Sequence, residues 1–310
     1  MIHSFSNFKT FLRCQRRWFY ESKVWCTNTK DPFRQEVIML SNLETISAFR
    51  GQVVDYTISK HVVELLNKRR DVGLQGVLSF AKKVFDKRRE FAEAQLYKDF
   101  SIKKTPNEER YAALVELEFG GGLNESDWDS AWQDVETSLT NLIGNMEVMG
   151  LLKAANYIKP QLSIHIKHDE KSVRCVPDLV AFYRKEPPLI VDWKVHFTGH
   201  RSYIDQLLLY AYALNECDHL YSYTQYLNGH DILSYRLLEY QLLKNVTRQY
   251  EISPLLLENT KERLSDEIYR LKKAGADQPY ESLNIENFDT AFDEADCLNC
   301  PFQNLCSNDN

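Results

Sequence analysis

The chain has 310 residues, of which 44% are hydrophobic and 26% are charged, and its formal net charge is −6. This length allows a sizeable buried core and exceeds that of a compact secreted scaffold. The composition is ordinary for a soluble cytoplasmic enzyme with no membrane segment and no signal peptide before Met1, and the negative charge argues against a general affinity for nucleic acids.

The N-terminal part of the sequence predicts helices. Residues 1–25 predict a capped helix with a lead-in, and a long helix that carries Asp55 is predicted from about Ser47 towards Lys68. Residues 75–155 also read as helices, with breaks where sequence rich in Gly, Pro and Asn cannot sustain a helix, at Thr105–Asn107 and Gly120–Asn124. We interpret residues 75–155 as a helical insertion in the domain described below.

The next region predicts a β-hairpin. Val180–Tyr183 is apolar, Arg184–Pro188 is polar and cannot continue a ladder, and Leu189–Val191 is the run expected of a buried strand. Because side chains alternate along a strand, Asp192 and Lys194 lie on the same face.

Pairing of these two strands would bring Asp178 beside Asp192. Two neighbouring carboxylates form a hard-oxygen site of the kind that magnesium or manganese accepts, and their like charges call for a cation. Lys194 would orient a nucleophile or neutralise charge that develops on a phosphoryl group, which predicts phosphodiester hydrolysis. An Asp-x-Lys tripeptide alone is also typical of a solvated strand edge, but the apolar flanks of this one argue against that reading.

A helix with apolar residues at helical spacing is predicted over residues 202–214. Gln206 and Tyr210 are four positions apart and therefore share a face. An amide and a phenol side by side could bind a backbone phosphate or hold Lys194, and the alternative is an ordinary helix packed on a sheet.

A second hairpin is predicted from Leu220–Leu227 and Ile232–Leu237, because Asn228-Gly229 between them is a strong turn signal. Alternating tyrosines in these strands could stack on unpaired bases, or they could pack the sheet against helices: Tyr221, Tyr223 and Tyr235. A further helix is predicted from about Pro254 to Lys273.

Three cysteines, Cys297, Cys300 and Cys306, lie close together near the C-terminus, and Cys14 could complete a set of four. Four thiols suit tetrahedral zinc or a cubane iron–sulfur cluster, and ligand count does not separate the two. Disulfides are disfavoured because seven cysteines are an odd number and no signal peptide is evident. The remaining cysteines are interpreted as core residues: Cys26, Cys175 and Cys217.

Taken in order, these motifs resemble the RecB-like branch of the PD-(D/E)XK nuclease superfamily. The resemblance is to its iron–sulfur members, such as the AddB-type nuclease module and the CRISPR-associated adaptation nucleases. It covers most of the chain and rests on a Ser-x4-Phe-x2-Cys-x-Arg-Arg-Trp-x-Tyr segment, Arg50-Gly51, Asp178, Asp192-x-Lys194, Gln206-x3-Tyr210 and Cys297-x2-Cys300-x5-Cys306.

This resemblance implies an α/β fold, with a restriction-endonuclease-like mixed sheet flanked by helices in a single domain of residues 1–310. It implies a 4Fe–4S cluster that joins residues 1–25 to residues 290–310, with zinc as the alternative, and a magnesium or manganese centre. The implied cluster ligands are Cys14, Cys297, Cys300 and Cys306. The implied catalytic residues are Asp178, Asp192, Lys194, Gln206 and Tyr210, and the metal-binding residues are Asp55, Asp178, Asp192 and Trp193.

The sequence departs from the family pattern at Asp55, where members usually have a histidine four residues after the glycine. Asp55 could replace that histidine as a metal ligand, or it could mark altered or lost activity. His61 is a poor substitute, because six helical positions rotate it away from the face of Asp55. On the strand before the hairpin, Gln161 stands where members often have an acid.

We therefore expect a metal-dependent DNA nuclease that acts on single strands or free ends. Such enzymes serve repair, CRISPR adaptation or antiphage defence, beside a helicase, integrase or defence-system partner. The alternative is a catalytically weakened DNA-binding or assembly subunit. Basic runs in the first third of the chain are typical of solvated helix faces, but near a nuclease site they could guide a strand: Lys68–Arg70, Lys82–Lys83, Lys87–Arg89 and Lys103–Lys104.

Overall fold

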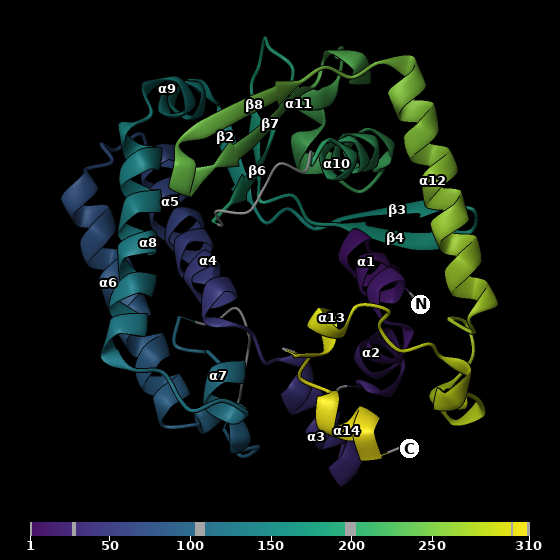
Figure 1. Cartoon of the computed structure of the whole chain (residues 1–310). Coiled ribbons are helices and arrows are strands. Elements are labelled where there is room, and N and C mark those ends of the chain that lie inside the picture. Colours follow the sequence, from purple (N-terminus) through teal and green to yellow (C-terminus); the bar gives the residue numbers. More distant parts are fainter. Residues whose placement is uncertain (1, 27–28, 103–108, 196–202, 299, 309–310) are drawn as a thin grey trace.

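The computed structural model describes residues 2–26, 29–102, 109–195, 203–298 and 300–308. Its centre is a five-stranded mixed sheet with helices on both faces (Figure 1). The β5–β6 pair is antiparallel and the β6–β7 pair is parallel. In spatial order the strands are β2 (Tyr157–Pro160), β5 (Leu179–Phe182), β6 (Leu189–Lys194), β7 (Arg236–Gln241) and β8 (Val246–Tyr250).

The predicted hairpin is confirmed as β5 and β6, in a register that pairs Leu179 with Val191. All of β5 and residues 189–191 of β6 are apolar because both faces of the sheet are covered. Val191 packs into the core on the side of α4, whereas Ile190 packs into the core on the side of α10. This alternation fixes which side chains of β6 reach each face.

One face of the sheet is covered by helices from the first half of the chain. The predicted long helix is confirmed as α4 (Ile46–Thr57), which continues through a π-helical turn (Ile58–Val62) into α5 (Val63–Asn67). The Thr45 side chain caps α4 by accepting from the Ala48 N–H. The α-helices described between α5 and β2 are α6 (Leu74–Glu93), α7 (Val115–Glu118), α8 (Glu125–Gly144) and α9 (Met146–Ala154).

Most of the described residues within 75–155 are therefore helical. That they form an insertion stays a prediction. The glycine break is confirmed between α7 and α8, where Gly122 has a φ of +88° and Asn124 begins α8 with a capping box. The predicted break at Thr105–Asn107 lies outside the described residues.

The other face carries α10 (Ile204–Glu216) and α12 (Pro254–Lys273), and the helix predicted at Pro254 is confirmed. A smaller sheet lies beside them, with the order β1 (Ile2–His3), β4 (Lys171–Cys175) and β3 (Ile164–His168). No helix in the described ranges has the length and apolar character that crossing a bilayer requires.

The second predicted hairpin is wrong. Tyr221–Tyr223 forms a 3₁₀ turn, α11 (Thr224–Leu227) follows it, and Ile232–Ser234 is another 3₁₀ turn. The ring of Tyr223 stacks on Phe182, with centroids 4.6 Å apart, so this tyrosine packs on the sheet instead of extending it. Packing therefore overrides the local β propensity. The hairpin that forms is β7 with β8.

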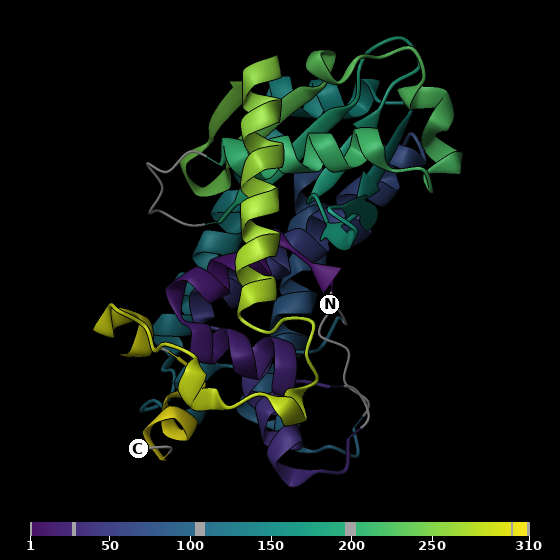
Figure 2. The same cartoon turned by 90° about the vertical axis from the view of Figure 1, so that its right-hand side faces the viewer.

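The two ends of the chain lie together (Figure 2). The N-terminal elements are α1 (Phe5–Arg13), α2 (Gln15–Phe19), a π-helical turn (Tyr20–Val24) and α3 (Pro32–Ser41), and the C-terminal helices are α13 (Glu294–Leu298) and α14 (Gln303–Asn308). Trp18, Phe19, Phe288 and Phe302 share one buried cluster. The Arg16 side chain donates to the carbonyl of Phe288 at 3.2 Å.

Candidate active site

Asp178, Asp192 and Lys194 come together where β5 begins and β6 ends. The Asp192 side chain is fully buried, and its Oδ2 lies 2.5 Å from the Lys194 Nζ. The Trp193 main-chain N–H donates to Asp178 Oδ2 at 2.9 Å, which holds the two carboxylates beside one another. The alternation along β6 places Asp192 and Lys194 on one face, as the sequence predicts.

Burial and mutual electrostatic interactions shift the pKa values of Asp178, Asp192 and Lys194. Burial and the neighbouring Asp192 raise the pKa of Asp178 well above its ordinary value, and Lys194 only partly offsets this. Burial also raises the pKa of Asp192, against the opposing effect of Lys194. Burial alone would lower the pKa of Lys194, but the two carboxylates raise it. Two carboxylates thus face one ammonium, and a further cation would stabilise their charged forms.

Helix α10 brings Gln206 and Tyr210 to Asp192. The Gln206 Nε2 donates to Asp192 Oδ1 at 3.1 Å and to the Tyr210 hydroxyl at 2.6 Å. Burial raises the pKa of Tyr210, which keeps the phenol protonated. The predicted shared face is confirmed, and the contact of Gln206 is with Asp192 rather than with Lys194. These two residues therefore orient a carboxylate.

Asp55 reaches the site from α4, on the other face of β6. Its Oδ1 accepts from the Trp193 indole at 3.1 Å and from the Gln161 Nε2 at 3.0 Å. Burial raises the pKa of Asp55, while these two hydrogen bonds lower it. Gln161 has a φ of +47°, and its N–H donates to the carbonyl of Asp178 at 3.0 Å. Gln161 thereby links Asp55 to the start of β5.

A cavity of about 780 Å³ opens onto Asp55, Asp178 and Lys194. Four basic residues line it as well, and they come from separate elements: Lys60, Arg88, Lys159 and Arg174. Arg88 is nearly fully buried and donates to Gln52 Oε1 at 3.1 Å. The cavity thus combines carboxylates with cations that suit phosphate groups. The sequence analysis did not single out Lys159 or Arg174, because each is an ordinary surface residue until the fold brings it here.

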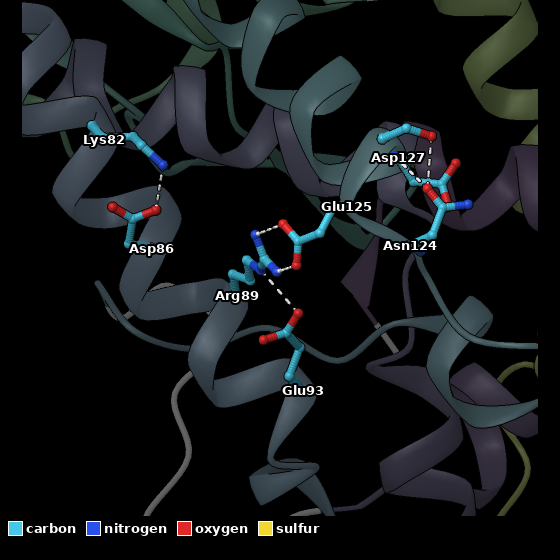
Figure 3. A network of polar contacts seen from close by, with 8 residues as sticks. Lys82, Asp86, Arg89, Glu93, Asn124, Glu125 and Asp127 are labelled. Atoms are coloured by element: carbon cyan, nitrogen blue, oxygen red, sulfur yellow. Dashed lines mark hydrogen bonds and ion pairs between the residues drawn. The ribbon is translucent and has the colours of Figure 1, made fainter.

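The other basic runs are largely neutralised by acidic partners (Figure 3). Lys82 pairs with Asp86 at 2.6 Å, and Arg89 pairs with Glu93 and Glu125. Lys87 pairs with Glu109 at 2.7 Å and Lys68 with Glu64 at 3.1 Å. These contacts are those of solvated helix faces. The pair Lys103–Lys104 lies outside the described residues.

No group of three or more His, Cys, Asp or Glu side chains is placed to hold a metal ion in the part of the chain that the structure describes. The Trp193 indole has only a donor to offer, so a metal ligand from this residue would be its main-chain carbonyl oxygen. The chemistry of the donors nevertheless fits a hard divalent cation, because they are carboxylate oxygens that outnumber the nearby ammonium.

The four cysteines Cys14, Cys297, Cys300 and Cys306 line one cavity of about 630 Å³ between the two ends of the chain. The Cys14 sulfur accepts from the Arg17 N–H at 3.4 Å. Burial raises the pKa of Cys300 to about 11, and the nearby Arg17 lowers it. All seven cysteines are free thiols.

Of the three cysteines interpreted as core residues, Cys175 is buried, while Cys26 and Cys217 are only half-buried. The core interpretation is therefore confirmed for Cys175 alone. The Cys217 thiol lies 3.5 Å from the carbonyl oxygen of His165, at the edge of its core cluster.

Comparisons with known proteins bear on the family of this chain. No curated protein matches the chain. Among solved structures, "Crystal structure of SSO0001" is 13% identical, with 80% of this chain and 96% of that chain covered and a TM-score of 0.29, a similarity too low to inform the fold. The family model described as "PD-(D/E)XK nuclease superfamily" matches residues 3–307. The chain therefore belongs to the PD-(D/E)XK nuclease superfamily.

Proposed function

We propose that this chain is a magnesium- or manganese-dependent deoxyribonuclease. The observation that carries the proposal is the buried Asp192–Lys194 ion pair, with Asp178 beside it, at a cavity lined by basic side chains. Phosphodiester hydrolysis needs both a site for a hard cation and positive groups for the charged ester, and this arrangement supplies both kinds.

Asp178, Asp192 and the carbonyl oxygen of Trp193 would hold the metal ion. When bound, such an ion polarises a phosphoryl oxygen and lowers the pKa of a coordinated water. Lys194 would bind the scissile phosphate and stabilise charge that develops on its oxygens. Gln206, fixed by Tyr210, keeps Asp192 in its orientation through the 3.1 Å hydrogen bond.

Asp55 would be a further oxygen ligand in place of the family histidine. Both of its hydrogen bonds fall on Oδ1, from Gln161 and from Trp193, so the carboxylate is held in one orientation. Its raised pKa means that its charged form would gain from a nearby cation.

We infer a 4Fe–4S cluster in the cysteine cavity, with zinc as the alternative, as in the RecB-like iron–sulfur branch. The support is the convergence of four thiols from both ends of the chain on one cavity. The role of the cluster would be to hold residues 1–25 against residues 290–310, with no part in the chemistry. The same branch suggests exonucleolytic or end-processing action on single strands or free ends, in repair, CRISPR adaptation or antiphage defence.

The test is an assay of the purified protein on end-labelled single and double strands, with and without manganese. We expect manganese-dependent degradation, reduced about 10²-fold or more in Asp192→Asn and in Lys194→Ala. Glu186→Gln, at an exposed acid that pairs with Arg236, is the matched control. Equal cleavage by all variants would contradict the site assignment. Strand binding without cleavage by the wild-type chain would favour the weakened DNA-binding or assembly subunit.

A further inference from the structure

Lys9 is a second amine close to Lys194, and no step of the proposed reaction uses it. It lies on α1. Figure 1 shows α1 and α4 below the main sheet, separated from one another. Its Nζ is 4.1 Å from the ring centroid of Phe5 and 5.9 Å from that of Tyr203. The Lys194 Nζ is 4.8 Å from the same Tyr203 ring. One aromatic ring therefore lies against two ammonium groups.

Two cations held this close repel one another. Burial and the neighbouring Lys194 lower the pKa of Lys9, while Asp192 partly opposes them. Asp192 pairs with Lys194 at 2.5 Å, and the nearby Asp205 pairs with Arg263 at 2.6 Å, so both acids near Lys9 already pair with another cation. Lys9 itself is exposed and contacts aromatic faces. An anion between Lys9 and Lys194 would relieve their repulsion.

Lys9 is also the first member of a basic row on α1 and α2. Lys9, Arg13 and Arg17 are spaced four apart, and all three line the cavity that holds the cysteines. Arg17 pairs with Glu21 at 2.8 Å, so the positive charge of Arg17 is partly neutralised. Arg13 also lines the adjoining cavity beside Phe292. The end of this row nearest the catalytic lysine is Lys9.

Four further basic residues lie in the cavity on the α4 side of Lys194, which Lys9 does not line. Cations are thus present on both the α4 side and the α1 side of Lys194. A nucleic-acid strand carries a phosphate at every nucleotide, so the phosphates that neighbour the one at Lys194 can reach these cations, and phosphate contacts dominate the affinity of a strand.

We propose that Lys9 binds a backbone phosphate of a single-stranded nucleic acid next to the phosphate held by Lys194. The strand then runs from the basic cavity at Arg88 and Lys159, across Lys194, to α1. This inference rests on the proposed function and specifies how the same site receives its substrate.

The experiment measures binding apart from cleavage. Fluorescence anisotropy of a labelled single-stranded oligonucleotide is recorded in buffer without divalent cations, over a series of salt concentrations. Each phosphate contact contributes about 0.7 to the slope of log K against log salt for a single strand. We expect Lys9→Ala to weaken binding and reduce the slope by about 0.7, and Lys9→Arg to retain the wild-type slope. Lys83→Ala removes an exposed charge from α6 and should change neither quantity.

An unchanged slope in Lys9→Ala would overturn the inference. If that variant instead loses iron or unfolds at lower temperature with an unchanged slope, Lys9 serves the thiolate cavity and the inference is also wrong. The two proposals fail differently: a wild-type chain that binds through Lys9 but never cleaves contradicts only the nuclease, whereas manganese-dependent cleavage with a Lys9-independent slope contradicts only this inference. A wild-type chain that neither binds nor cleaves contradicts both.

Discussion

The Trp193 main-chain N–H donates to Asp178, and the indole of the same residue donates to Asp55. One residue of β6 therefore connects a carboxylate of the hairpin to a carboxylate of α4. The spacing of Asp55, Asp178 and the adjacent Asp192 depends on Trp193. The same residue links the sheet to α4 at the site.

Asp55→Ala should raise the manganese concentration needed for half-maximal cleavage by about tenfold or more, because removal of a ligand or its support typically costs this much metal affinity. Glu64→Ala, at an exposed acid on the helical continuation of α4 that pairs with Lys68, is the control. A titration of initial cleavage rate against manganese measures the shift. If Asp55→Ala titrates like the wild type, Asp55 is no ligand.

Tyr210→Phe should lower the cleavage rate less than Gln206→Ala does, because it leaves the bond from Gln206 to Asp192 in place. Loss of the hydroxyl should cost about 1 kcal/mol of unfolding free energy. The double variant should be less impaired than the product of the single effects, since both residues act through Asp192. Single-turnover rates of the four proteins test this. Independent effects would separate Tyr210 from the orientation of Asp192.

Glu44 should make stability depend on pH. Burial raises its pKa to about 8, against the opposing charge of Arg88 and with a further increase from Glu116. A raised pKa means that the folded state binds the proton more tightly, so the unfolding free energy should fall as the pH rises from the ordinary value of 4.5 towards 8.

Glu44→Gln should therefore match the wild type near pH 5 and exceed it by on the order of 2 kcal/mol above pH 8. Urea unfolding at a series of pH values measures this difference. Glu64→Gln, at an exposed acid paired with Lys68, should track the wild type throughout. Parallel curves for Glu44→Gln and the wild type would show that Glu44 titrates normally.

Cys297→Ser should reduce bound iron and sulfide and lower the thermal unfolding midpoint, because it removes one of four thiols that line the shared cavity. Cys26→Ser is a matched control, since Cys26 is also a half-buried free thiol but does not line this cavity. Metal analysis distinguishes the cases. Zinc in the wild-type protein would show that the site holds zinc and not an iron–sulfur cluster. An equal iron content in both variants would show that Cys297 is not a ligand.

The sequence predicted the β5–β6 hairpin and the convergence of Asp178 with Asp192, because both depend on local pairing and on alternation along a strand. It failed at residues 220–235. A turn forms at Asn228-Gly229, but its flanks are short helical turns instead of paired strands, and Tyr223 stacks on Phe182. The basic cavity could not be predicted from the sequence, for a different reason. Arg88, Lys159 and Arg174 come from α6, β2 and β4, and only the three-dimensional arrangement places them together.

The contact between Arg16 and Phe288 joins residues 272 positions apart. During synthesis the ribosome releases the N-terminal helices long before their aromatic partners, so Trp18 and Phe19 must wait for Phe288 and Phe302 to emerge. Closing so long a loop is slow and entropically costly. Packing of α1, and with it the placement of Lys9, is therefore expected to be a late folding event, which would delay strand binding until Phe288 and Phe302 have been synthesised.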